Sequence, residues 1–152
     1  FPYTTLFRSI VLQPRLEDLL EHHVFRATID GHTFYIPLWH HELVYDRPGE
    51  PGVTGGELTV QCTPTLPENM TVDENNNLHV HIQKEKCAMW DGPDVIDIPV
   101  CANKTVQLDR TRLYVKEYQR VVFKGEGMAR IDHRDIYDIS KKSDIVVHVR
   151  FV

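Results

Sequence analysis

Short stretches in which apolar and polar residues alternate run through much of the chain. The clearest are residues 58–62 (Leu-Thr-Val-Gln-Cys) and 78–82 (Leu-His-Val-His-Ile). They predict half-buried strands, because successive side chains of a strand point to opposite faces. We expect the two strands to pair as an antiparallel meander. In the second strand Leu78, Val80 and Ile82 would face the core, and the histidines between them would face solvent.

Further strands are expected on both sides of these two. β-Branched and aromatic residues at 24–29 and 32–38 flank Asp30-Gly31, a dipeptide typical of a two-residue hairpin turn. Other predicted strands lie in the second half of the chain, at residues 95–100, 105–108, 112–115, 120–124 and 144–151. Long helical patterns are absent, and Leu-Glu-Asp-Leu-Leu at 16–20 can form about one turn. The pattern therefore predicts an all-β fold of two small sandwich-like or barrel-like subdomains, with one short helical turn near 16–21.

Turn-forming residues suggest how the chain is divided. Residues 46–56 hold two prolines and four glycines and predict a loop. Residues 84–93 are polar and irregular, which places a first β subdomain at 10–88 and a second at 89–152. No exact internal repeat relates the two halves. Residues 1–9 (Phe-Pro-Tyr-Thr-Thr-Leu-Phe-Arg-Ser) resemble a translated sequencing-adapter oligonucleotide, so they carry no weight in the predicted fold.

Composition narrows the possible functions. The chain has 17 basic and 22 acidic residues, a formal charge of −5, which disfavours a nucleic-acid partner. The three cysteines, Cys62, Cys87 and Cys101, are far apart in the sequence, and we expect them to be reduced thiols. No apolar run reaches the roughly 18 residues of a membrane span, so we expect no membrane partner and a cytoplasmic location. The sequence contains no phosphate-loop, dinucleotide-binding or serine-nucleophile motif. We therefore expect that the protein is not an enzyme and binds no cofactor.

Two stretches near the C-terminus carry a more specific signal. Residues 121–128 read Val-Val-Phe-Lys-Gly-Glu-Gly-Met, and residues 139–147 read Ile-Ser-Lys-Lys-Ser-Asp-Ile-Val-Val. In order and spacing they resemble the strand leading into Gly-x-Gly-Met and the Ser-x-Arg-Gly-Asp-Leu-x-Val strand of the C-terminal domains of DnaJ-type co-chaperones. Two glycines also allow a sharp turn after a strand. We expect a structural role for four residues of these motifs: Gly125, Gly127, Met128 and Asp144.

Parts of the first half resemble the same family. Residues 56–80 resemble its link between two barrel-like subdomains, and residues 16–20 resemble the motif that opens the first subdomain. The resemblance implies a co-chaperone that binds unfolded client polypeptides and delivers them to a DnaK-type chaperone. The family's client groove lies beside the strand after that opening motif, here residues 24–29. The client-binding residues implied are Phe25, Ala27 and Ile29, with Tyr35 on the next strand. The simpler alternative is that all four are ordinary core residues.

Several family features are not found in this sequence. A J-domain with its His-Pro-Asp loop is not among these residues, so contact with a DnaK-type chaperone would require a J-domain outside them. The cysteine-rich zinc module is also missing, which implies the zinc-free class. We do not expect dimerisation, because the family's dimerising helix does not follow Phe151 and Val152.

Histidines suggest an alternative function. The spacing of His79, His81 and Glu85 resembles the first metal-binding motif of cupins, but no Pro-x-Gly-x-x-His element follows to complete the site. His40 and His41 are adjacent and would point to opposite faces of a strand, so they are not expected to bind one ion. We therefore predict no metal. A cupin-like metal-binding barrel and a non-catalytic structural or interaction β module remain the alternatives.

Overall fold

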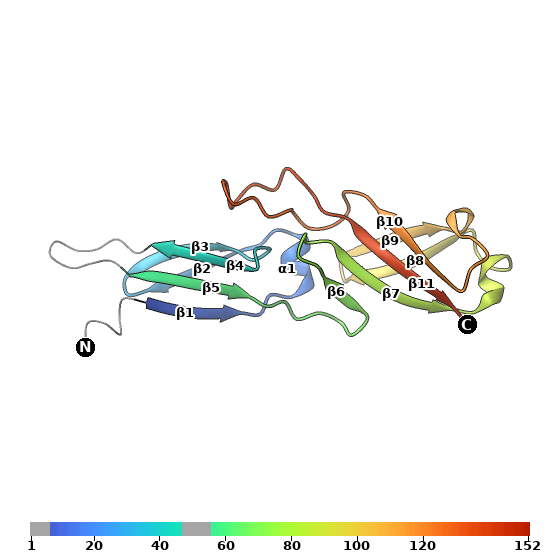
Figure 1. Cartoon of the computed structure of the whole chain (residues 1–152), viewed down its shortest axis with the longest axis horizontal. Helices are drawn as coiled ribbons and strands as arrows, with labels where there is room; N and C mark the ends of the chain where they lie inside the picture. The colour runs from blue at the N-terminus through green and yellow to red at the C-terminus, as the bar shows by residue number, and fades with distance from the viewer. Residues whose placement is uncertain (1–6, 47–55) are drawn as a thin grey trace. The chain divides into compact units, whose positions relative to one another are not determined.

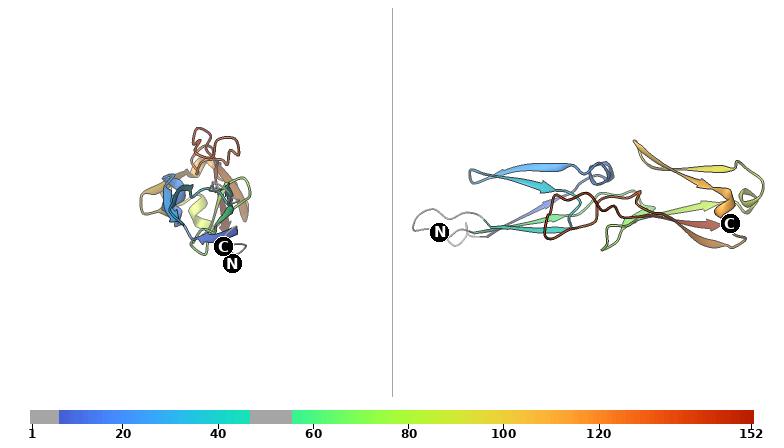
Figure 2. Two further views of the ribbon diagram at one scale, coloured as in Figure 1. Left: turned by 90° about the vertical axis from the view of Figure 1, so that its left-hand side faces the viewer. Right: turned by 90° about the horizontal axis from the view of Figure 1, so that it is seen from above.

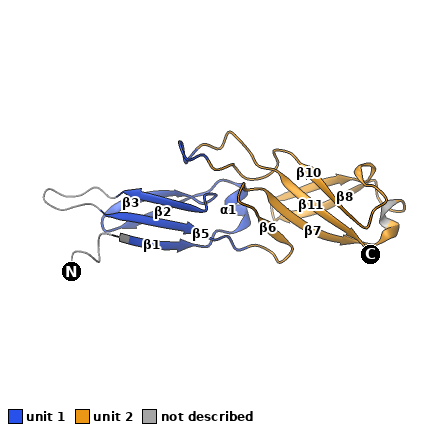
Figure 3. Cartoon of the chain, in the orientation of Figure 1, with its two compact units in different colours: residues 1–65, 132–137 blue, residues 66–131, 138–152 orange. Residues whose placement is uncertain are grey.

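The computed structural model describes residues 7–46 and 56–152, and it is built mainly of β-strands (Figure 1). This confirms the predicted all-β class. Residues 1–6 and most of the predicted 46–56 loop lie outside the described residues. The chain divides into two compact units, the first formed by residues 1–65 and 132–137 and the second by residues 66–131 and 138–152 (Figure 3). No helix in the described part of the chain is long and apolar enough to cross a membrane.

The first unit combines a three-stranded sheet with a separate hairpin. Its elements in chain order are β1 (Phe7–Leu12), α1 (Leu16–Leu20), β2 (Val24–Ile29), β3 (His32–Pro37), β4 (Glu42–Asp46) and β5 (Glu57–Cys62). The sheet has the order β1-β5-β4, with β1 parallel and β4 antiparallel to β5. Strands β2 and β3 pair with each other across Asp30 and Gly31, which both have positive φ, as the predicted hairpin turn requires.

Alternation within the strands of the first unit creates its core. Phe34 and Ile36 of β3 are buried, as are Leu58 and Val60 of β5. The ring of Phe34 lies 5.5 Å from the ring of Tyr45 on β4, so the hairpin packs on the sheet. Figure 2 shows the hairpin as a layer separate from the sheet. The unit is thus a small two-layer sandwich.

The second unit has a four-stranded sheet and a second hairpin. Its elements are β6 (Met70–Val72), β7 (Leu78–Lys84), the 3₁₀ helix η2 (Lys86–Met89), β8 (Val95–Cys101), β9 (Lys104–Asp109), the 3₁₀ helix η3 (Arg110–Arg112), β10 (Tyr118–Phe123) and β11 (Ile145–Phe151). The sheet order is β10-β11-β7-β6, and β7 is parallel to β11. Strands β8 and β9 form the hairpin. Leu78, Val80, Val147 and Val149 are fully buried under the sheet.

The two units repeat one topology, although their sequences contain no exact repeat. In each, the first strand is followed by a short helix and a hairpin, and then by two antiparallel strands. The last strand returns parallel to the first and lies at the centre of the sheet. Strand β1 corresponds to β7, hairpin β2-β3 to β8-β9, β4 to β10, and β5 to β11. The second unit adds β6 at the edge beside β7.

Long-range pairing explains where the structure departs from the predicted organisation. The predicted antiparallel pairing of residues 58–62 with 78–82 is wrong, because β5 and β7 lie in different sheets. The division between the units falls at residues 65 and 66, not after 88, because β7 joins β11 in the second unit. Residues 113–117 form no strand, whereas β4 and β6 were not predicted. Strand β1 begins at Phe7 and so includes three of the residues given no weight above.

The Gly-Glu-Gly-Met segment lies against the start of β11. Gly125 has a φ of +70°, and its N–H donates to the Asp144 carboxylate at 3.0 Å. At Gly127 the reason for glycine is space, because a Cβ there would lie 2.5 Å from the Ser143 hydroxyl oxygen. Ser143 and Met128 are buried, and the Ser143 N–H donates to the Met128 carbonyl at 2.7 Å. These contacts therefore hold the segment against the start of β11.

Candidate functional site

The outer edge of β2 offers an unpaired strand in the first unit. Among the residues that the structure describes, β2 pairs with β3 alone. Two large apolar side chains at its start are exposed, Val24 and Phe25, each at 44%. An unpaired strand edge presents a row of backbone donors and acceptors, and neighbouring apolar side chains add affinity for an added strand.

The hairpin register places the four predicted client-binding residues on two faces. Phe25 pairs with Ile36, and Ala27 pairs with Phe34. Because paired residues share a face, Phe25, Ala27 and Ile29 lie on the inner face of the hairpin. Ala27 is buried at 8% exposure, and Ile29 is half-buried. Tyr35 pairs with Arg26 on the opposite, outer face and is 52% exposed. The structure thus brings three of the four together and separates Tyr35 from them.

The other strand of the hairpin has its outer edge partly occupied. The Tyr35 carbonyl accepts hydrogen bonds from the hydroxyls of Tyr45 at 3.0 Å and Tyr137 at 2.7 Å. Burial, with a smaller contribution from Tyr137, raises the pKa of Tyr45 above its usual value, so this hydroxyl stays protonated and donates. Edge pairing by another chain is therefore more accessible along β2 than along β3 at this point.

The turn between β3 and β4 separates the adjacent histidines. His40 is buried, and its Nε2–H donates to the Ile136 carbonyl at 2.9 Å. Burial lowers the pKa of His40, so it is neutral at physiological pH. His41 is exposed. The two side chains therefore lie in different environments, in line with the expectation that they do not bind one ion.

His79 and His81 lie on the outer face of the second unit's sheet, while Leu78 and Val80 are buried beneath it. The parallel pairing of β7 with β11 brings His148 beside them. The ring of His148 stacks on the ring of His81 with centroids 4.4 Å apart and on that of His79 at 5.2 Å. Glu85 lies at the start of η2, where its carboxylate accepts from the Cys87 thiol. Among the described residues, no group of three or more His, Cys, Asp or Glu side chains is arranged to hold a metal ion.

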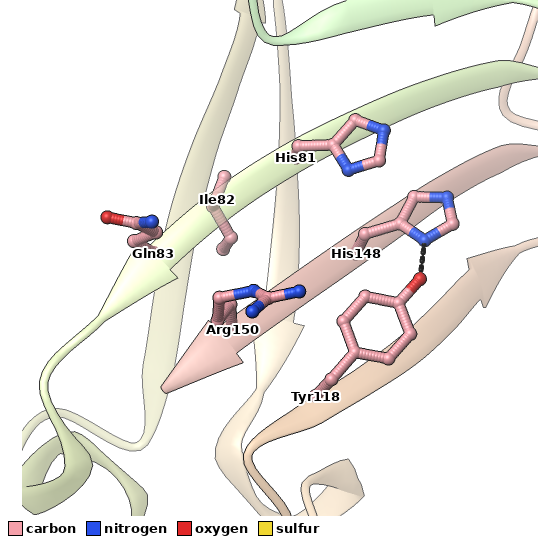
Figure 4. A pocket seen from close by; sticks show the side chains of 6 residues that line it. All are labelled: His81, Ile82, Gln83, Tyr118, His148 and Arg150. Atoms are coloured by element: carbon pink, nitrogen blue, oxygen red, sulfur yellow. Dashed lines mark hydrogen bonds between the residues drawn. The ribbon is translucent and has the colours of Figure 1, made fainter. Parts of the chain in front are cut away.

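Hydrogen bonds connect this histidine cluster into a chain. His79 Nε2 lies 2.9 Å from the Asp73 carboxylate, and His79 Nδ1 lies 2.9 Å from His148 Nε2. The Tyr118 hydroxyl contacts His148 Nδ1 (Figure 4). Because a carboxylate accepts and does not donate, the direction is fixed when both rings are neutral: Tyr118 donates to His148, His148 to His79, and His79 to Asp73.

Two groups of this hydrogen-bonded histidine cluster have shifted pKa values. Burial, followed by the neighbouring His81, His79 and Arg120, lowers the pKa of His148 to about 4. For Asp73, burial raises the pKa, but hydrogen bonds from His79, Asn77 and Asn75 outweigh burial and hold the pKa below its usual value. The cluster therefore holds an ionised aspartate and a neutral His148 at physiological pH.

Sequence analysis did not identify His148, Tyr118 or Asp73 as partners of His79 and His81. Alternation along residues 145–151 would have placed His148 on the outer face of its strand. It could not have shown that this strand pairs in parallel with β7, which lies more than sixty residues earlier in the chain. The cluster depends on that pairing.

Comparison with known proteins adds no assignment, because neither a protein family model nor a curated protein matches this chain. The resemblance to DnaJ-type co-chaperones consequently rests on the chain's own residues. They are the Gly-x-Gly-Met segment at 125–128 and the strand that begins after Asp144. The features that bear on function are therefore these motifs and the unpaired edge of β2.

Proposed function

We propose that this chain is the client-binding region of a DnaJ-type co-chaperone and binds extended segments of unfolded polypeptides along the outer edge of β2. The observation that carries the proposal is that unpaired edge, with Val24 and Phe25 exposed at its start. The motifs at residues 125–128 and 144–147 support the family.

An unpaired strand edge suits a ligand of varied sequence. Backbone hydrogen bonds along β2 would be formed with any extended segment, whatever its side chains. Phe25 and Ile29 face inward on either side of Ala27, which is small and buried. They would contact every second client side chain and favour apolar ones. Tyr35, on the outer face with Arg26, would contact the client side chains that point the other way.

Delivery of the client to a DnaK-type chaperone is part of the proposal through the family resemblance alone. In this family the J-domain stimulates the chaperone's ATPase. We assign that stimulation to no residue of the described part of this chain. Client capture itself would need no ATP and no bound cofactor. The chain on its own is therefore expected to delay aggregation of a client without refolding it.

The test is suppression of aggregation of a chemically denatured reporter enzyme, followed by light scattering. The wild-type chain is compared with the double variant Phe25→Asp, Ile29→Asp. Val11→Asp is the matched control, because Val11 is 57% exposed on β1, another edge strand of the same unit. We expect the double variant to lose most of the suppression and the control to keep it.

A second measurement guards against loss of folding in the double variant. A photo-reactive phenylalanine analogue is placed at residue 25 or at residue 11 of the otherwise unchanged chain, and cross-linking to the denatured reporter is compared. Strong cross-linking from residue 25 alone supports the proposal. Equal cross-linking from both positions, or equal suppression by the folded double variant and the wild type, contradicts the assignment to β2.

A further inference from the structure

Two pockets of the second unit share Tyr118, one on the outer face of the β10-β11-β7 sheet and one beside the start of β10. One, of about 280 Å³, is lined by His81, Ile82, Gln83, Tyr118, His148 and Arg150 (Figure 4). The other, of about 400 Å³, is lined by Tyr114, Lys116, Tyr118, Gln119 and Arg120. Neither lining contains a carboxylate, although acidic residues outnumber basic ones in the chain, 22 to 17. This surface is thus positively charged on an acidic protein.

The cations of this surface have no charge partner within the described chain. Over residues 7–46 and 56–152, no carboxylate forms an ion pair with Lys116, Arg120 or Arg150. Other basic residues of the same unit are paired, such as Arg110, which lies 2.9 Å from Asp94. Three unpaired cations around these two pockets repel one another, and an anionic ligand would relieve that repulsion.

The strand register sets the spacing of these cations. Two rows of paired residues cross the sheet, one formed by Arg120, His148 and His81 and the next by Tyr118, Arg150 and Gln83. The two arginines therefore lie on neighbouring strands, offset by one two-residue step, with a diagonal Cα separation of about 8 Å. Lys116 precedes Tyr118 by a further two residues. Lys116 lies before the start of β10, so the strand register places the two arginines alone.

Tyr118 holds the centre of this surface in place. Its hydroxyl donates to His148, which is anchored through His79 to Asp73. The guanidinium of Arg150 lies over the Tyr118 ring, 5.9 Å from its centroid. Contact with the ring restrains the long arginine side chain, so less conformational freedom is lost when a ligand binds. Tyr118 is therefore a positioning residue for Arg150.

The spacing distinguishes between possible anions. Every second side chain of an extended peptide lies on the same side at a repeat of about 7 Å, which is close to the diagonal spacing of Arg120 and Arg150. An extended segment with acidic residues at alternate positions offers a separate carboxylate to each arginine, whereas a free oxyanion offers one group to both. Nucleic acid is disfavoured by the net charge of −5. We propose that this face binds an extended acidic polypeptide segment, with carboxylates at alternate positions paired with Arg120 and Arg150.

The test uses fluorescence anisotropy of a labelled peptide of alternating glutamate and serine, titrated with the full chain at low ionic strength. Arg120→Gln and Arg150→Gln should each weaken binding by about fivefold, the upper range for a single exposed ion pair. Tyr118→Phe, which removes the hydroxyl contact with His148, should weaken it less. Arg134→Gln is the matched control, because Arg134 is exposed and lies in the first unit. It changes the net charge equally and should leave the affinity unchanged.

A second peptide of the same composition, with its glutamates grouped together, separates spacing from overall charge. We expect it to bind more weakly than the alternating peptide. Equal affinity for the two peptides, no binding at all, or equal weakening by the control variant would overturn the proposal. Displacement of the peptide by inorganic phosphate at an equal concentration would also overturn it, since the pockets would then be sites for a free oxyanion. Thermal unfolding of each variant checks that the surface is still formed.

Discussion

His79 and His148 share a hydrogen bond of 2.9 Å between Nδ1 of one ring and Nε2 of the other, although 69 positions separate them in the sequence. The bond holds one proton, which His148 donates when both rings are neutral. A further proton on His148 would occupy Nδ1, the atom that accepts from Tyr118. Protonation of His148 therefore reverses this hydrogen bond, so that Nδ1–H donates to the Tyr118 hydroxyl oxygen, and it places a charge near Arg120.

The stability of the second unit should depend on pH through His148. Its pKa is about 4 in the folded chain against 6.5 for an ordinary histidine, so the unfolded chain binds more protons between these values. The contribution is fully present above pH 6.5 and is lost as the pH falls through 4. Urea unfolding at a series of pH values measures it. His148→Gln should flatten the fall in unfolding free energy over this range, whereas His32→Gln, on the β2-β3 hairpin, should not. Identical slopes for wild type and His148→Gln would contradict the assignment.

Gly127→Ala should destabilise the chain more than Gly125→Ala. A methyl group at 127 would lie 2.5 Å from the Ser143 hydroxyl oxygen and 3.0 Å from the Ser143 carbonyl oxygen, so it displaces buried atoms, at about 3 kcal/mol. At 125 nothing lies within 4 Å of the added carbon, and the positive φ alone costs about 1 kcal/mol. Denaturant unfolding of the two variants gives the comparison. A larger loss at 125 would show that the contact with Ser143 relaxes freely.

Ser143→Ala should reduce the cost of Gly127→Ala. The Ser143 hydroxyl lies 2.5 Å from the Asn76 carbonyl oxygen and 2.8 Å from that of Met128, so its removal alone should cost about 1–2 kcal/mol. It also removes the atom nearest the added methyl group. A double-mutant cycle should therefore show a favourable coupling of about 1 kcal/mol between the two substitutions. Additive effects would mean that the carbonyl of Ser143, not its hydroxyl, limits the space at 127.

Local patterns predicted individual elements well and their partners poorly. The helical turn at 16–20 and the hairpin around Asp30 and Gly31 depend on neighbouring residues, and both are found as predicted. The alternation at 78–82 likewise assigned the faces of β7 correctly. Its partner is β11, near the end of the chain, and no local pattern encodes a parallel pairing across sixty residues. The unit boundary and the antiparallel meander were misplaced for that one reason.

In the candidate sites too, the sequence predicted the local features and not those that depend on tertiary pairing. Strand alternation correctly placed Phe25, Ala27 and Ile29 on one face, but the position of Tyr35 depends on which residue it pairs with across the hairpin. Counting from the two-residue turn sets Tyr35 opposite Arg26, so this face could have been derived from the sequence. The cationic surface around Tyr118 could not, because it joins three strands whose register is set by tertiary pairing.

The cysteines should differ sharply in their reactivity toward thiol reagents. The rate at which one of them, Cys62, is labelled should report the opening of the first unit. Cys62 ends β5 and is buried, and burial raises its pKa to about 11, so it is both shielded and protonated near neutral pH. Cys87 is exposed. With a chromogenic disulfide reagent, Cys87 should react rapidly in the native chain, and Cys87→Ser should remove that fast phase. Cys62 should react only when the first unit opens, at a rate that rises with urea, and Cys62→Ala should abolish this slow phase. Fast labelling of Cys62 without denaturant would show that the end of β5 opens locally, without unfolding of the sandwich.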